Sequence, residues 1–137
     1  MLLTNPKKIT GMDIAPHYFD PYKKHFEKYA TEHNIDFSYQ VQDSTNPASV
    51  SEVDMLHIDS LHSPKHLIKE LKLHAPKCKK YIVFHDTANF STSKGLLKTI
   101  AEYITEVEQS WKIIDHYIHR VGYTVIERVS RVKSHRE

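Results

Sequence analysis

Two short apolar segments of this chain each end in an acidic residue that lies close to a histidine. The first, VDMLHIDSLH, runs from Val53 to His62, and the second, KYIVFHDT, runs from Lys80 to Thr87. Between them, Ser63–Pro76 has the length and apolar spacing of one helix. This order predicts a strand, a crossover helix and a second, parallel strand. Ligands of open α/β sheets bind at the carboxyl ends of such strands, so the two segments also predict where the chemistry lies.

The rest of the chain continues the alternation of strands and helices. Helices are expected after Asp20-Pro21, after Ser63-Pro64 and from about Ser93–Gly95 onward. The expected strands are Lys8–Ile14, Ile35–Val41, Val53–Ile58, Tyr81–Phe84, Trp111–Ile118 and Tyr123–Val129. The third and fourth of them are near-continuous apolar runs, as expected for parallel strands covered on both faces. The last two read as an antiparallel pair, so the predicted class is α/β with a mostly parallel sheet and a C-terminal hairpin.

Composition narrows the functional classes. With 137 residues we expect one domain over residues 1–129 and a basic, flexible tail over residues 130–137. A net charge of +2 does not indicate binding to nucleic acid or to an anionic membrane. No signal peptide and no apolar run long enough to cross a bilayer is present. The lone Cys78 excludes an intrachain disulfide and favours an intracellular protein, so we expect a cytoplasmic location.

The two strand-end carboxylates are candidate metal ligands. Asp59 and Asp86 each follow an apolar strand, and neighbouring strands lie roughly 5 Å apart. Both side chains are therefore expected to converge at one rim, where carboxylate oxygens suit Mg²⁺ or another divalent cation. His62 and His85 flank this position and can act as base, ligand or hydrogen-bond donor. The alternative is that the two carboxylates only cap the loops that follow.

A further histidine leaves a second type of metal site open. His57 lies on the same strand face as Asp59, and we expect it to be a core histidine rather than a ligand. The spacing His57-x-Asp59-x-x-His62, with His66 in the next helical turn, would also suit the Zn²⁺ of a hydrolase. No complete zinc signature is present, so this hypothesis ranks third.

On these residues the chain resembles class I S-adenosylmethionine-dependent methyltransferases over roughly Ile9–Val129. The segments VDMLHIDSLH and KYIVFHDT are similar to the fourth and fifth strands of that Rossmann-like family. More narrowly, they resemble a subgroup of metal-assisted O-methyltransferases in which these strands end in Ile-Asp-x-x-His and His-Asp. The resemblance implies that Asp59 and Asp86 bind the metal or the acceptor hydroxyl. It also implies that His62 or His85 orients or deprotonates a small hydroxylated or sugar acceptor.

The resemblance also implies residues that hold the cofactor S-adenosylmethionine. Asp13 fits the acid that binds the ribose at the end of the second strand, and Asp43 fits the acid near the adenine. Asp59 at the rim is the third cofactor-binding residue that the resemblance implies. The segment Trp111–Ile118 with Tyr123–Arg128 fits the closing hairpin of the family's sheet.

One part of the family pattern has no counterpart in the sequence. Only twelve residues precede Asp13, and none of Gly11, Gly95 and Gly122 lies in a GxG pattern. The first strand and its Gly-rich turn, which lets the backbone approach the cofactor, are therefore expected to be absent. The fold would be N-terminally truncated, as in a fragment, half of a split protein or a degenerate descendant.

Three functions follow in order of preference. The first is an O-methyltransferase that is inactive as an isolated chain and active once a first strand is supplied from elsewhere. The second is an inactive methyltransferase-like interaction module, and the third is the metal-dependent hydrolase. Unpaired strand edges recruit other strands, so a homo-oligomer or a partner chain that supplies the strand is expected.

Overall fold

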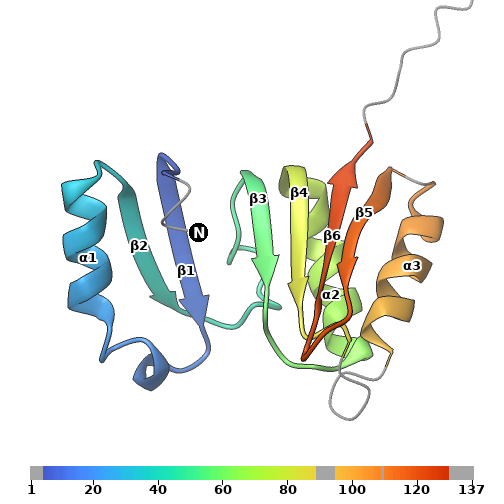
Figure 1. Ribbon diagram of the computed structural model, residues 1–137, viewed down its shortest axis with the longest axis horizontal. Helices are drawn as coiled ribbons and strands as arrows, with labels where there is room; N and C mark the ends of the chain where they lie inside the picture. The colour runs from blue at the N-terminus through green and yellow to red at the C-terminus, as the bar shows by residue number, and fades with distance from the viewer. Residues whose placement is uncertain (1–4, 89–94, 109, 130–137) are drawn as a thin grey trace, which may run out of the picture. The chain divides into compact units, whose positions relative to one another are not determined.

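The computed structural model describes residues 5–88, 95–108 and 110–129 of the chain (Figure 1). Its contacts divide the chain into two compact units, residues 1–49 and residues 50–137. The expected single domain over residues 1–129 stays a prediction, and the tail over residues 130–137 lies outside the described residues. None of the helices in the described ranges is long and apolar enough to span a membrane.

The first unit is a two-stranded parallel sheet with one helix. Its elements are β1 (Lys8–Asp13), the 3-10 turn η2 (Pro16–Tyr18), α1 (Lys23–Glu32) and β2 (Asp36–Val41). Aromatic side chains fill the space between α1 and the sheet, with ring centroids 4.1–6.1 Å apart; they are Phe19, Phe26, Phe37 and Tyr39.

The first helix starts later than the Asp20-Pro21 signal predicts. Residues before Lys23 form three-residue turns, in which the amide of Tyr22 donates to the carbonyl of Phe19 (2.8 Å). Tyr22 is the N-cap and makes no side-chain capping bond. Because these turns close after three residues, the α-helix begins at Lys23, two residues after Pro21.

The second unit is a four-stranded mixed sheet in the order β3-β4-β6-β5. Strands β3 (Val53–Ile58) and β4 (Cys78–His85) are parallel, whereas β6 (Tyr123–Arg128) is antiparallel to both β4 and β5 (Trp111–Tyr117). This confirms the predicted α/β class, the parallel pairing of the two Asp-ending strands and the C-terminal hairpin.

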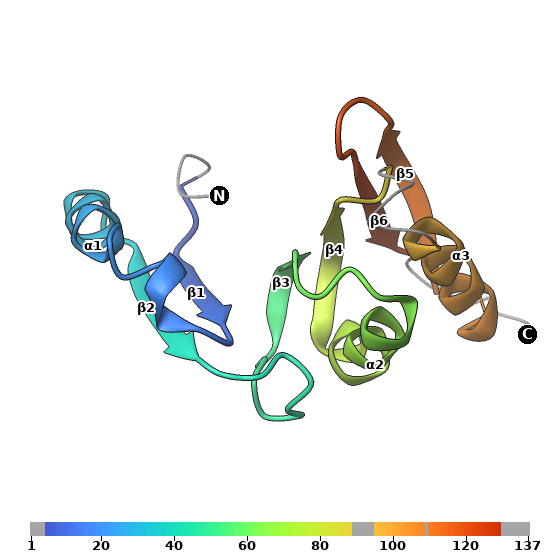
Figure 2. The same ribbon diagram turned by 90° about the horizontal axis from the view of Figure 1, so that it is seen from below.

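The two helices of this unit lie on the same face of its sheet. Helix α2 (Pro64–His74) follows β3 and continues into the 3-10 turn η3 (Ala75–Lys77), and α3 (Leu96–Glu106) follows β4 (Figure 2). The start of α2 at Ser63-Pro64 is as predicted. The start of α3 agrees too, with Gly95 as its N-cap.

The core of the second unit lies between these helices and the sheet. Its buried side chains are Leu67, Leu71, Ala75, Cys78, Ile82, Phe84, Leu96, Ile100, Tyr103, Trp111 and Ile126. The guanidinium of Arg128 lies 4.4 Å from the Trp111 ring centroid and donates to the carbonyls of Ala75 (2.7 Å) and Cys78 (2.8 Å). It thereby joins the end of α2 to the start of β4 and covers one end of the core.

The opposite face of this sheet has no helix among the described residues of the second unit. Met55 is 39% exposed and His57 is exposed, so the expectation of strands covered on both faces is wrong here, as is that of His57 as a core histidine. The reason is that α2 and α3 both return across the other face. Partial desolvation still lowers the pKa of His57, against the opposing effect of Asp59.

The packing of α2 predicts a large cost for shortening its central core residue. Leu71 is completely buried, so Leu71→Ala should lower the free energy of unfolding by about 2–5 kcal/mol, the usual cost of such a cavity. Chemical denaturation measures this directly. Lys69→Ala, on the exposed side of the same helix, is the control and should change stability by less than about 0.5 kcal/mol. Equal effects of the two changes would contradict the packing of α2 through Leu71.

Candidate functional site

Parallel pairing of β3 with β4 brings the predicted acids and histidines to one rim. The last residues that β3 and β4 pair with each other are Ile58 and Phe84, so Asp59 and His85, which follow them, lie side by side. The Nε2 atom of His62 lies 2.6 Å from Asp86 Oδ2 and 3.7 Å from Asp59 Oδ1. These four residues (Asp59, His62, His85 and Asp86) are called the rim cluster below.

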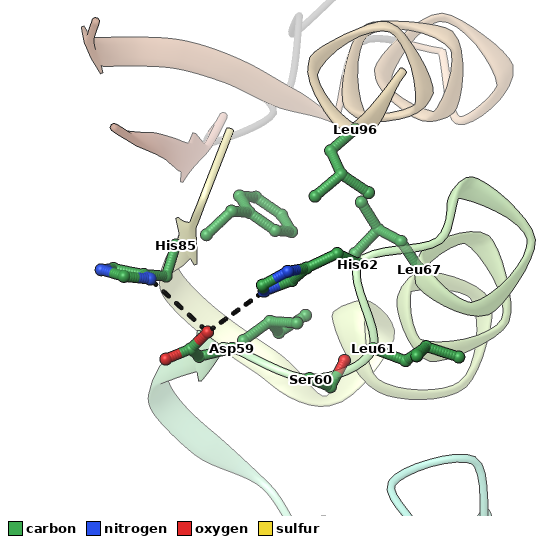
Figure 3. Close-up of a pocket in the computed structure, with 9 residues that line it drawn as sticks. Asp59, Ser60, Leu61, His62, Leu67, His85 and Leu96 are labelled. Carbon is green, nitrogen blue, oxygen red and sulfur yellow. Dashed lines mark ion pairs between the residues drawn. The ribbon is translucent and has the colours of Figure 1, made fainter. Parts of the chain in front are cut away.

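The rim cluster has the donor spacing of a metal site. Asp59, His62 and Asp86 each offer one ligand atom, and these atoms all lie within 4.8 Å of one another. The Nδ1 atom of His85 lies 3.2 Å from Asp86 Oδ2 and 3.5 Å from Asp59 Oδ1. Figure 3 shows His62 and His85 reaching Asp59 from opposite sides. Two carboxylates and one imidazole are a donor set that fits a divalent cation.

An apolar pocket adjoins the rim cluster on its helical side. Its apolar walls come from β3, β4, α2 and α3 through Ile58, Phe84, Leu67 and Leu96 (Figure 3). Helix α3 therefore contributes to the surroundings of the site through its first residue.

Asp86 holds an unusual backbone conformation that the C-terminal hairpin fixes. Its φ is +60°, in the left-handed region that Asp tolerates better than most residues, and its side chain is mostly buried. The amide of Asp86 donates to the carbonyl of Gly122 (2.9 Å), and the amide of Ala88 donates to that of Val121 (2.9 Å). The turn between β5 and β6 thus holds the loop that carries Asp86.

Buried hydroxyl groups join the same two segments. The hydroxyl of Thr124, on β6, donates to that of Thr87 (2.8 Å) and lies 2.8 Å from Nδ1 of His116 on β5. Thr87 directly follows Asp86, so this contact restrains the loop from its other side. Sequence reasoning did not single out these residues, since their contact joins positions 37 residues apart.

Glu70 fixes the loop that carries Asp59 and His62. This glutamate of α2 is 2% exposed, and its Oε2 accepts a hydrogen bond from the hydroxyl of Ser60 (2.8 Å). Its Oε1 lies 3.3 Å from Nε2 of His66. Among the described residues, the ligand atoms that lie together are those of Asp59, His62 and Asp86, without His57 or His66, so the zinc spacing of the sequence is not assembled. The i,i+4 spacing of His66 and Glu70 was the sequence signal that could have revealed the pair.

Two of the three acids predicted to hold the cofactor, Asp13 and Asp43, belong to the first unit. Asp13 ends β1, and its Oδ1 accepts a hydrogen bond from the amide of Ala15 (3.0 Å). Asp43 follows β2, and its Oδ1 accepts from the amide and the hydroxyl of Thr45 (both 2.8 Å). Both acids stand at the carboxyl ends of a parallel strand pair and fix the turns that follow. Their role towards a cofactor stays a prediction.

Comparison with known proteins identifies the fold. No protein-family model matches the sequence, and no curated protein is detectably similar to it. Among solved structures, the N-methyltransferase NodS from Bradyrhizobium japonicum WM9 aligns with a TM-score of 0.64 at 10% identity, over 90% of this chain and 75% of NodS. Magnesium protoporphyrin IX methyltransferase (ChlM) from Synechocystis PCC 6803, with bound SAH, aligns with a TM-score of 0.59 at 11% identity, over 88% and 63% of the two chains.

A third structure, from Streptococcus mutans in complex with SAH, aligns with a TM-score of 0.59 at 10% identity, over 90% of this chain and 77% of its own. At such identities the likeness shows the fold, which is that of methyltransferases. The predicted fold type is thereby confirmed.

The close contact between the turn at Gly122 and the loop that carries Asp86 predicts that position 122 tolerates only glycine. Gly122 has φ +70°, and a Cβ there would lie 2.5 Å from the Tyr117 carbonyl oxygen and against Ala88. Gly122→Ala should therefore destabilise by more than the roughly 1–2 kcal/mol of a left-handed alanine alone. Gly95→Ala is the matched control, because Gly95 has φ +86° and, among the described residues, a Cβ there would approach only the Pro64 side chain, at 3.2 Å. Urea unfolding measures the free energy of unfolding of both variants. An equal loss of stability in the two would argue against the close contact of Gly122 with the Asp86 loop.

Proposed function

We propose that this chain is a methyltransferase-type domain that, once a first strand is supplied from elsewhere, transfers the methyl group of S-adenosylmethionine to a hydroxyl oxygen of a small hydroxylated or sugar acceptor. The observation that carries the proposal is the rim cluster, which stands at the carboxyl ends of β3 and β4 in a methyltransferase fold. Ligands of open α/β sheets bind at this edge. The single free Cys78 is in keeping with a protein of the cytoplasm.

A divalent cation is part of the proposal. Asp59 and Asp86 would hold it through their carboxylate oxygens, and His62 is placed to provide a nitrogen ligand. Such a cation lowers the pKa of a bound hydroxyl and so eases its deprotonation. The neighbouring protein side chains provide the remaining functions of the site.

The two histidines take different roles in this proposal. His62 is held at 2.6 Å by the mostly buried carboxylate of Asp86, which suits a residue that orients the acceptor or the cation. His85 makes longer contacts, 3.2 Å and 3.5 Å, with Asp86 and Asp59, and its side chain is 41% exposed. It is therefore the better candidate to accept the proton of the acceptor hydroxyl. The methyl group comes from S-adenosylmethionine.

Cofactor binding requires more than the acids Asp13, Asp43 and Asp59. Among the described residues, no strand ends in a Gly-rich turn, and β1 and β3 each have a partner on one side only. We propose that a further strand with such a turn completes the domain, supplied by a partner chain or by a fusion. An interaction module without catalysis is the second candidate function, which the lack of this turn favours.

The cation proposal is tested by titration of Mg²⁺ and Mn²⁺ into the protein. Weak binding is expected because hard cations retain water in open carboxylate sites, and Asp86→Asn should abolish it, since the amide removes a negative ligand. Asparagine tolerates the left-handed backbone, so the fold should survive. Asp54→Asn, an exposed acid on β3 paired with Lys80, is the control and should leave binding unchanged. Tight Zn²⁺ binding that is lost in His62→Ala, with Mg²⁺ silent, would favour the hydrolase instead.

The cofactor proposal is tested with the 137-residue chain and with an extended version. The chain alone should bind S-adenosylmethionine poorly or not at all and transfer no methyl group, because the close backbone approach of a Gly-rich turn is missing. Each 1.4 kcal/mol lost costs about a factor of ten in affinity. Adding a strand with a Gly-rich turn, fused or in trans, should restore binding that Asp13→Asn removes. Micromolar binding by the chain alone, measured by calorimetry, would contradict the need for the added strand.

A further inference from the structure

A row of side chains continues from the rim cluster across the sheet face that carries no helix in the second unit. His85 on β4 pairs in register with Tyr123 on β6, and Tyr123 pairs with Tyr117 on β5. Directly opposed residues of antiparallel strands project from the same face with Cβ atoms about 4.5–5.5 Å apart. Asp59 stands beside His85, so the row runs Asp59, His85, Tyr123, Tyr117 along one rim.

The two tyrosines form an aromatic stack that is partly exposed. Their rings stack with centroids 5.4 Å apart and planes 14° apart, and Tyr117 is 47% exposed. The Tyr123 hydroxyl donates to Asp115 Oδ2 (2.8 Å), which holds the ring in place and raises the pKa of its phenol. The ring of His119 lies 5.2 Å from that of Tyr117 at an angle of 58°. Contacts with Asp115 and with His119 therefore hold the two tyrosine rings.

The surroundings restrict the charge of a ligand on this surface. Asp59 and Asp86 lie at one end of the row, and Asp115 lies beside Tyr123. These carboxylates disfavour an acidic ligand. The exposed part of the Tyr117 ring favours a molecule with a flat, weakly polar face, such as an aromatic ring or the CH face of a sugar ring.

We propose that Tyr117 and Tyr123 form the subsite that binds the ring of a non-acidic, ring-bearing hydroxylated acceptor, with its hydroxyl beside His85 and the rim cluster. This inference rests on the proposed function, which it extends by naming the acceptor class and the residues that select it. His85 connects the two parts, because it contacts Asp59 and Asp86 and is the cross-strand neighbour of Tyr123.

The test uses catechol, methyl β-D-glucopyranoside and ethylene glycol as probes, titrated into the full chain with and without Mg²⁺. Aromatic NMR signals of the tyrosines report on binding. At least one of the two ring probes should shift the signals of Tyr117 and Tyr123, whereas ethylene glycol, which has hydroxyls but no ring, should not. A response to catechol alone identifies an aromatic acceptor, and a response to the glucoside alone identifies a sugar.

Variants of Tyr117 and of its neighbour Ile118 distinguish loss of the aromatic ring from a general effect on the fold. Tyr117→Leu keeps apolar volume but removes the flat ring, and it should weaken ring-probe binding about threefold to tenfold, as expected for one aromatic contact. Tyr117→Phe should bind as the unchanged protein does. Ile118→Ala is the control, because Ile118 is the next residue and is 66% exposed. Mg²⁺ binding should be the same in all three variants.

Three outcomes would overturn the inference. The tyrosine signals of the unchanged protein would not respond to either ring probe, or they would respond to ethylene glycol as strongly as to the ring probes. Alternatively, Tyr117→Leu and Ile118→Ala would weaken ring-probe binding equally. Failure of the cation proposal is seen separately, as an absent Mg²⁺ response in the unchanged protein. Ring-dependent shifts at Tyr117 without Mg²⁺ would then still support the subsite.

Discussion

The parallel pairing of β3 with β4 is the constraint on which the rest of the second unit depends. The register that joins Ile58 to Phe84 places Asp59 and Asp86 at the same rim, and the crossover through α2 must return across one face of the sheet. Only a short loop separates the end of β3 from the start of α2 at Pro64. The short loop therefore restricts His62 to a position over the rim, where it contacts Asp86.

The rim cluster is held by contacts that lie outside it. Glu70 secures the loop of Asp59 through the Ser60 hydroxyl, and the turn around Gly122 secures the left-handed backbone of Asp86. Both restraints act on residues or backbone groups beside the carboxylates rather than on the carboxylates themselves. The carboxylates thus keep their oxygens directed at the histidines, which is the preorganisation that a cation or an acceptor hydroxyl requires.

The second unit is finished on one face of its sheet and not on the other. Its core is fully formed between the sheet and α2 with α3, while Met55 and His57 lie on the opposite face and remain exposed. Strands of parallel pairs are usually covered on both faces, and unpaired edges attract further strands. The uncovered face makes the tyrosines of the hairpin accessible. The edge of β3, which has no further strand beside it in this sheet, can pair with another strand.

The sequence by itself determined the element types and the two acids at the strand ends, because apolar periodicity and proline signals act within a few residues. It also indicated that Asp59 and Asp86 would meet, since parallel strands share a rim. It did not predict that His57 would be exposed, because that depends on which face α2 and α3 cover. Only the tertiary structure decided that His62 pairs most closely with Asp86 and that Tyr123 lies beside His85. These contacts join residues far apart in the chain, so their geometry follows from strand register and packing, which local sequence does not specify.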